Sequence, residues 1–201
     1  MEELIILEAY LSEEHRKMLR EESGISELAI NSRGYYTETD SAGLEQLGFD
    51  ENQKELVPAL VIPVRDVTGE VVLHRIRPDK PRPNIHRPGK VNKYEMPTGS
   101  SIVLDVPPFT FKHLQNVSVP LWFCEGERKC DALISRGIAA ISLPGVWAWK
   151  RNGLPLPDFD DIPMIGRELR AMFDSDAEEK TGIRQALVCL ARYLKGRAGD
   201  A

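Results

Sequence analysis

The strongest constraint on the fold is an alternation of short apolar runs and helical patterns between residues 118 and 197. The runs "VPLWFC" and "IAAISL" end at Cys124 and Leu143, and "EGERKCDALISRG" between them has apolar residues at helical spacing and a final glycine. A third run, "ELRAMF", precedes a segment with one apolar stripe, formed by Ile183, Ala186, Leu187, Leu190 and Leu194. Strands that alternate with helices predict a parallel sheet with right-handed crossovers, so the expected fold class is α/β.

The chain before this alternation has two different patterns. Residues 1–56 contain capping serines, apolar faces and glycine stops, which predict short helices. Residues 57–77 contain two β-branched runs around the turn "RDVTGE", which predict a β-hairpin. Residues 78–98 are rich in proline and basic residues, which predicts a long loop with a binding role. We therefore divide the chain into a helical N-terminal region (1–56), a basic β-hairpin and loop region (57–117) and an α/β domain (118–201).

Composition limits the class of protein. Of 201 residues, 42% are hydrophobic and 28% are charged, which is typical of a soluble globular chain of one or two domains. The acidic start "MEELIILEAYL" differs from a signal peptide, and no apolar run approaches the roughly 18 residues of a membrane span. The cysteines Cys124, Cys130 and Cys189 have no CxxC spacing and are expected to be reduced thiols. The sequence thus predicts a cytoplasmic protein with no membrane partner.

The net charge of −5 conceals an uneven distribution. Residues 1–56 hold 5 basic and 14 acidic side chains, whereas residues 57–98 hold 8 basic and 4 acidic ones. The total charge argues against a protein that coats nucleic acid non-specifically. The excess of positive charge in the middle segment allows a local basic patch.

Three carboxylates are expected at one edge of the predicted sheet. Glu125 directly follows the first strand, and Asp174 and Asp176 directly follow the third. In parallel sheets, ligands bind at the carboxyl ends of the strands. Carboxylates that lie close together repel one another, and a hard divalent cation such as Mg²⁺ (or Mn²⁺) offsets that repulsion. The alternative is a solvated loop with an acidic helix cap, because "DSDAEE" also begins a helix.

Further side chains near this edge allow more than one interpretation. Lys129 follows Glu125 by one helical turn and is expected to point in roughly the same direction. It can neutralise phosphate charge at the site, or it can pair with Glu125 and temper the acidic edge. Arg128 is expected to be solvated. Trp147 and Trp149 can stack on nucleic-acid bases or cover a sheet edge.

The segment with these carboxylates resembles a known domain family. "LWFCEG", a helix, a strand that ends in "LPG", and "LRAMFDSD" before a last helix are similar to the Toprim domain of bacterial primases, topoisomerases and some nucleases. By this resemblance Glu125 is the family's glutamate, and Asp174 and Asp176 are its metal-binding aspartates; the three form the candidate catalytic and metal site. "EGERKCDALISRGIAAISLPGVWAW" is more similar still to an uncharacterised Toprim-like domain of phage and plasmid replication proteins. There the domain often lies beside primase-polymerase or helicase modules.

The preceding segment also carries a resemblance. "LVIPVRDVTGEVVLHRIRP" and "KYEMP" resemble the part of bacterial primases that precedes Toprim and forms a basic surface for template and nucleotide. The resemblance implies phosphate or nucleic-acid contacts by Arg75, Arg77, Lys90 and Lys93. Lysine and arginine on a strand face and an adjoining loop suit a polyanion, and solvated loop charges are the alternative.

The sequence departs from the family pattern in one respect. A full Toprim sheet continues past the second helix with another strand, whereas this sequence ends in "KGRAGDA". The α/β domain is therefore expected to be truncated or to lack that strand. The sequence also contains no zinc ribbon of the primase kind and no Walker-type "GxxxxGKS" motif.

These patterns lead to one expected function and two alternatives. We expect a magnesium-dependent, DNA-acting Toprim-like domain of a mobile-element replication protein, a primase-like nucleotidyltransferase that uses nucleotides and single-stranded DNA. A nuclease would use the same site with water as the attacking group. A non-catalytic module would instead recruit single-stranded DNA or a helicase or primase partner.

Overall fold

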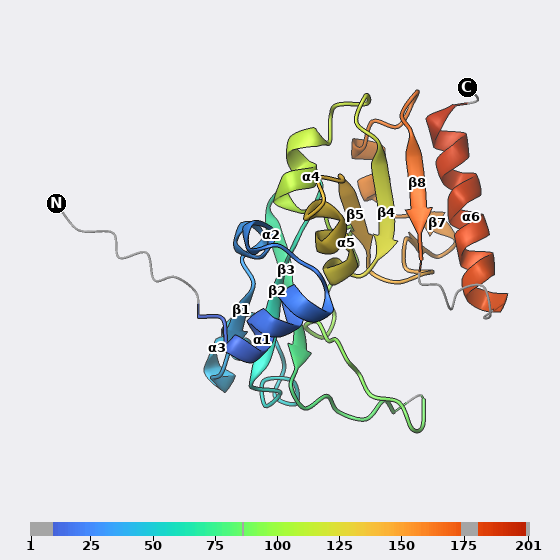
Figure 1. Ribbon diagram of the computed structural model, residues 1–201. Helices are drawn as coiled ribbons and strands as arrows, with labels where there is room; N and C mark the ends of the chain where they lie inside the picture. The colour runs from blue at the N-terminus through green and yellow to red at the C-terminus, as the bar shows by residue number, and fades with distance from the viewer. Residues whose placement is uncertain (1–9, 86, 174–180, 200–201) are drawn as a thin grey trace.

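The computed structural model describes residues 10–85, 87–173 and 181–199 (Figure 1). Within them, two three-stranded sheets and a two-stranded ribbon are surrounded by helices. None of the described helices is both long enough and apolar enough to span a membrane.

The described part of the N-terminal region, from residue 10 onward, contains several short helices. Ser12 and Ser26 cap helices as the sequence indicates, because their hydroxyl oxygens accept hydrogen bonds from the backbone N–H groups of His15 and Ala29. Gly34 ends one helix with φ 83°, a left-handed conformation that glycine adopts without strain. The helical segments are α1 (Glu13–Lys17), the π-helical turn η1 (Met18–Glu22), α2 (Glu27–Arg33) and α3 (Ser41–Gln46).

The hairpin region forms an antiparallel sheet in the order β1-β2-β3. The predicted hairpin consists of β2 (Ala59–Arg65) and β3 (Val71–Pro78), and Ile76 on β3 is buried opposite Val61. The short strand β1 (Tyr36–Glu38) pairs with the other edge of β2, which the helical pattern of its surroundings did not predict. Since side chains alternate along a strand, the residues on either side of Ile76 face away from that core.

The second sheet is parallel, in the order β5-β4-β8. β4 (Leu121–Glu125) lies in the centre, between β5 (Ala140–Leu143) and β8 (Leu169–Met172). Glu125 lies opposite Leu143 and Cys124 lies opposite Met172, so the carboxyl ends of the three strands meet at one edge. The predicted α/β fold with a parallel sheet and flanking helices is therefore confirmed.

The two faces of the parallel sheet pack into different apolar cores. On one face, Phe123 and Ile141 pack with Leu190 of α6 (Thr181–Ala198). On the other face, Cys124 and Ala140 pack with α5 (Glu127–Ile134), and the same core includes Ile30, Leu60 and Ile62. Figure 1 shows α5 and α6 on opposite sides of the sheet. The second core therefore joins the parallel sheet to the helical region and to the hairpin.

Short elements connect these layers. Asp105 and Ser142 exchange two backbone hydrogen bonds of 3.0 and 2.9 Å, so the segment around Asp105 covers the outer edge of β5. This segment leads into a helix, and the return to β8 contains a β-ribbon and a 3₁₀ turn. The helix is α4 (Pro108–His113), the β-ribbon consists of β6 (Lys150–Arg151) and β7 (Leu154–Pro155), and the 3₁₀ turn is η2 (Pro157–Asp161).

Candidate active site and nucleic-acid interface

Glu125 is placed by a sharp turn from strand to helix. It is the last residue of β4 and lies half-buried at the carboxyl edge of the sheet. Gly126 follows with φ 88° and ψ 142°, a backbone conformation that residues with a Cβ rarely adopt, and α5 begins immediately at Glu127. The glycine thus permits the turn that leaves the Glu125 carboxylate at the edge where parallel sheets bind ligands.

An open pocket of about 920 Å³ lies over this turn. One wall consists of the turn and the first residues of α5, and another consists of the chain around Lys93 together with Arg75 of β3. Four residues predicted for the site line the pocket: Arg75, Lys93, Glu125 and Lys129. The fold therefore brings basic residues of the hairpin region to the glutamate of the α/β domain, although they lie far apart in the sequence.

The predicted aspartates Asp174 and Asp176 lie outside the described residues. The strand that leads to them, β8, runs parallel to β4 and lies directly beside it. Their part in a metal site stays a prediction. Among the residues that the structure describes, no three histidine, cysteine, aspartate or glutamate side chains form a group able to hold a metal ion.

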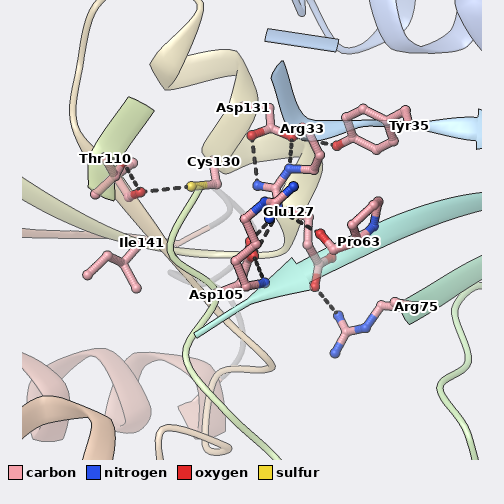
Figure 2. A network of polar contacts seen from close by, with 12 residues as sticks. Arg33, Tyr35, Pro63, Arg75, Asp105, Thr110, Glu127, Cys130, Asp131 and Ile141 are labelled. Atoms are coloured by element: carbon pink, nitrogen blue, oxygen red, sulfur yellow. Dashed lines mark hydrogen bonds and ion pairs between the residues drawn. The ribbon is translucent and has the colours of Figure 1, made fainter. Parts of the chain in front are cut away.

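Arg75 has a carboxylate partner that the sequence did not indicate. Its Nη1 atom lies 2.8 Å from Oε1 of Glu127, and the two side chains are only 12% and 4% exposed. Figure 2 shows this pair, whose Glu127 is the first residue of α5. Arg75 and Glu127, which come from different walls of the pocket, thus largely neutralise each other, and this reduces the charge that Arg75 offers to a phosphate.

The other predicted basic residues occupy different positions. The guanidinium of Arg77 lies 5.4 Å from the ring centroid of Tyr94, which itself lines the pocket. Lys93 is exposed at the pocket wall, and Lys129 lies half-buried in α5. Lys90 is exposed on the loop beyond the pocket lining. The loop lysines are thus available to an incoming anion, whereas Arg77 is held against an aromatic ring.

The expectation that Arg128 is solvated is wrong. Its side chain is 17% exposed, and its Nε atom donates a 2.8 Å hydrogen bond to the hydroxyl oxygen of Ser23. Ser23 follows η1, so this contact fixes the N-terminal region against the start of α5. The sequence could not indicate it, because the partners are 105 residues apart.

A buried ionic network sets the position of α5 relative to the hairpin (Figure 2). Arg33 donates two hydrogen bonds to Asp131, of 2.7 and 2.8 Å, and two of 2.8 Å to Asp105. It also donates one of 3.2 Å to the carbonyl oxygen of Pro63 in β2, and the Tyr35 hydroxyl donates one of 2.6 Å to Asp131. Since these residues come from all three parts of the chain, the network fixes the two walls of the pocket in one geometry.

The environment of this network shifts three pKa values, and one of them is that of the Asp131 carboxyl, which burial raises although the charge of Arg33 opposes the rise. Burial alone would lower the pKa of the Arg33 guanidinium, but the carboxylates of Asp105 and Asp131 raise it well above its ordinary value. Burial, and then the charge of Asp131, raise the pKa of the Tyr35 hydroxyl well above its ordinary value. Arg33 therefore stays charged and Tyr35 stays neutral in the folded protein.

The two tryptophans after β5 have different surroundings. Trp149 is buried and stacks on Tyr193 with ring centroids 5.3 Å apart, so it belongs to the core and cannot stack on a base. Trp147 is exposed, and Nζ of Lys150 lies 4.7 Å from its ring centroid. Base stacking is therefore excluded for Trp149 and stays a prediction for Trp147.

Comparison with known sequences shows that part of this chain is similar to a domain family. A sequence profile described as "Domain of unknown function (DUF3854)" matches residues 110–200. The matched region contains the parallel sheet and Glu125, whereas the N-terminal region and the hairpin lie outside it. A comparison with curated proteins gave no match.

Several solved primase structures have a similar fold. One is the Aquifex aeolicus primase with its zinc-binding and RNA polymerase domains, at a TM-score of 0.64 and 14% identity, covering 93% of this chain and 48% of that chain. A DnaG primase catalytic domain bound to single-stranded DNA gives 0.54 and 14% identity, with 87% and 57% covered. The primase fragment of the bacteriophage T7 primase-helicase protein gives 0.51 and 18% identity, with 88% and 60% covered. The resemblance to primases is thus confirmed for the fold, and the chain spans about half the length of the Aquifex structure.

Proposed function

We propose that this chain is a magnesium-dependent, DNA-acting domain that carries out nucleotidyl transfer of the primase type. The observation that carries the proposal is the pocket that joins Glu125 to Lys93 and Lys129 at the carboxyl edge of a parallel sheet. The primase-like fold supports it, because the pocket combines the hairpin region and the parallel sheet, and both are covered by the structural similarity.

The donor set fits a hard divalent cation. Glu125 ends the central strand, and the neighbouring strand β8 leads into Asp174 and Asp176, so three carboxylates follow two adjacent parallel strands. Mg²⁺ prefers oxygen ligands and is usually held by a few carboxylates together with water and substrate phosphates. When bound, such an ion would neutralise phosphate charge. We therefore assign Glu125, Asp174 and Asp176 as its ligands.

The residues of this chain would act on the substrates as follows. Lys93 and Lys129 would hold phosphate groups by charge, and Lys90 would contact the nucleic-acid backbone further out. A hydroxyl at the end of the growing nucleic-acid strand would attack the α-phosphorus of a nucleoside triphosphate. The bond between that phosphorus and the leaving pyrophosphate would break. Glu125 would accept the proton of the attacking hydroxyl, or else serve only as a metal ligand. Arg75 and Arg77 would contribute less than the lysines, because Glu127 and Tyr94 already engage them.

The wider context belongs to the same proposal. We place the chain in a phage or plasmid replication protein of the cytoplasm, where a primase-polymerase or helicase module would act beside it. The T7 relative, a fragment of a primase-helicase protein, supports such an arrangement. We also propose the division into a helical region (1–56), a hairpin and loop region (57–117) and a Toprim-like domain (118–201).

The test is incubation of the protein with labelled single-stranded DNA, nucleoside triphosphates and Mg²⁺. Extension products that disappear in Glu125→Gln, but persist in the control Glu45→Gln at an exposed residue of α3, would support the proposal. Shortened products that appear without nucleotides would indicate a nuclease at the same site. DNA binding with neither product, in a folded protein, would favour a non-catalytic module.

A further inference from the structure

The loop beyond the hairpin contains a built projection, which we call the finger (described residues 82–85 and 87–92). The Asn84 N–H donates a 2.8 Å hydrogen bond to the carbonyl oxygen of Lys90, and the Asn92 N–H donates one of 2.9 Å to that of Arg82. The side-chain amide of Asn84 also donates to Asn92, at 2.7 Å. These bonds pair the two sides of the finger as in a short β-ribbon.

The base of the finger is fixed to the hairpin. Arg82 donates two hydrogen bonds of 2.6 Å to the buried carboxylate of Glu95. Glu95 in turn exchanges two backbone hydrogen bonds with Ile76 of β3. Figure 1 shows this green segment extending away from both sheets. The finger is thus a projection whose backbone is paired and whose base is fixed to the hairpin.

Two exposed apolar side chains lie on the finger, and one of them also lines the pocket. Ile85, near the tip, is 85% exposed, and Val91, opposite Pro83 in the stem, is 45% exposed. Val91 lines the 920 Å³ pocket that also contains Tyr94 and Glu125. A single exposed aliphatic side chain is common on protein surfaces. A pair of them on one projection, with one member in the lining of a candidate active site, is a more specific feature.

Exposed basic side chains lie close to this pair in the sequence. Arg87 and Lys90 are exposed on the finger, and Lys93 is exposed where the finger meets the pocket. Arg87 also lines the pocket. A surface that combines positive charge with exposed apolar side chains suits a single nucleic-acid strand, because cations contact its phosphates and apolar side chains contact its unpaired bases. An acidic peptide would use the charges and leave the apolar side chains without a role.

We infer that the finger holds a single DNA strand by its bases as well as its phosphates: Ile85 and Val91 contact the unpaired bases, and Arg87 and Lys90 contact the backbone. Ile85 acts as an apolar wedge against the base stack, as aliphatic side chains do in proteins that unstack DNA. The inference takes its partner from the proposed function. It does not require catalysis, so it can stand or fall separately.

The first experiment measures the affinity for a labelled single-stranded oligonucleotide at several salt concentrations. Ile85→Ser should weaken binding about fivefold at every salt concentration, because an apolar base contact releases no counterions. Arg87→Ala combined with Lys90→Ala should lower the slope of log K against log salt by about 1.4, since each single-strand phosphate contact contributes about 0.7. The control Leu28→Ser, which changes an 81% exposed side chain on α2, should leave both quantities unchanged.

The second experiment detects unstacking with 2-aminopurine in the oligonucleotide, whose fluorescence rises when its neighbours unstack. Wild type should raise the fluorescence of the bound strand, and saturating Ile85→Ser should raise it clearly less. Equal fluorescence and equal affinity for wild type and Ile85→Ser would overturn the inference. A wild-type protein that does not bind the single strand would also overturn it. So would competition by poly-glutamate that displaces DNA from wild type, if Ile85→Ser binds DNA with the affinity of wild type. Binding that depends on Ile85 without any extension activity would refute only the proposed reaction.

Discussion

The guanidinium of Arg75 on β3 lies 2.8 Å from the carboxylate of Glu127 at the start of α5, and both side chains are largely buried in the wall of the pocket. The pair connects the antiparallel sheet to the turn that follows Glu125, the last residue of β4 in the parallel sheet. It also divides the basic residues of the pocket into two groups. Arg75 already has an anion, whereas the exposed Lys93 is available to phosphate.

This division predicts different effects on DNA binding. Lys93→Ala should weaken the affinity for single-stranded DNA and lower its salt slope by about 0.7, because one phosphate contact is lost. Arg75→Ala should change the slope by much less. Fluorescence anisotropy across a salt series measures both, with Lys112→Ala on α4 as a control. A larger loss of slope in Arg75→Ala than in Lys93→Ala would contradict the division.

The same pair predicts a reversed order for stability. Arg75→Ala leaves the carboxylate of Glu127 buried without its partner, so the free energy of unfolding should fall by about 3 kcal/mol. Lys93→Ala should change it by less than about 0.5 kcal/mol, as expected for an exposed side chain. Urea denaturation measures both values. In the double variant Arg75→Met with Glu127→Gln, most of the loss should be recovered, and a double variant that is less stable than Arg75→Ala would argue against a buried pair.

The Arg33 network should be more sensitive still. Arg33→Met leaves two buried carboxylates, Asp105 and Asp131, without a cation, so the free energy of unfolding should fall by at least about 3 to 5 kcal/mol. Adding Asp105→Asn and Asp131→Asn should restore part of it. The exposed Arg136 provides a matched control, since Arg136→Met should be nearly neutral. If Arg136→Met lost as much stability as Arg33→Met, the loss in Arg33→Met could not be assigned to the buried ion pairs.

Tyr35 predicts a dependence on alkaline pH. Because its folded-state pKa is raised above the ordinary value near 10, the unfolded chain loses the hydroxyl proton first as the pH rises. The contribution of Tyr35 is therefore complete below about pH 10 and is lost above it, at up to about 1.4 kcal/mol per pH unit. Tyr35→Phe should be less stable at pH 8, where it lacks the hydrogen bond to Asp131, but should lose less stability between pH 10 and pH 11. The control Tyr10→Phe, at an exposed tyrosine, should follow wild type.

The elements with a clear local pattern were predictable from sequence. The apolar runs before Glu125 and after Gly137 predicted β4 and β5, and the serine caps predicted α1 and α2. β1 was missed because it has three residues and its partner strand begins more than twenty residues later. A strand that is defined by pairing rather than by its own pattern leaves little signal in the sequence.

The candidate site was predictable only where its residues belong to a local sequence pattern. Glu125 stands out because it lies between a strand and a glycine turn, and Lys129 follows from helical spacing. Glu127 and Asp131 look like ordinary charges of the first helical turns, and only the fold shows that they pair with Arg75 and Arg33. Long-range ion pairs of this kind depend on which surfaces meet, which a single sequence does not encode locally.

The metal site itself is best tested by melting curves of wild type and Asp174→Asn, each in EDTA and in Mg²⁺, with Glu45→Gln as a control. In EDTA, Asp174→Asn should melt no lower than wild type, because it relieves repulsion with Glu125 and Asp176, and asparagine caps a helix nearly as well. Mg²⁺ at ten times its Kd should stabilise wild type by about 1.4 kcal/mol, or about 3–5 °C for a chain of this size, and should stabilise Asp174→Asn clearly less. Equal shifts in the two proteins would mean that Asp174 holds no magnesium.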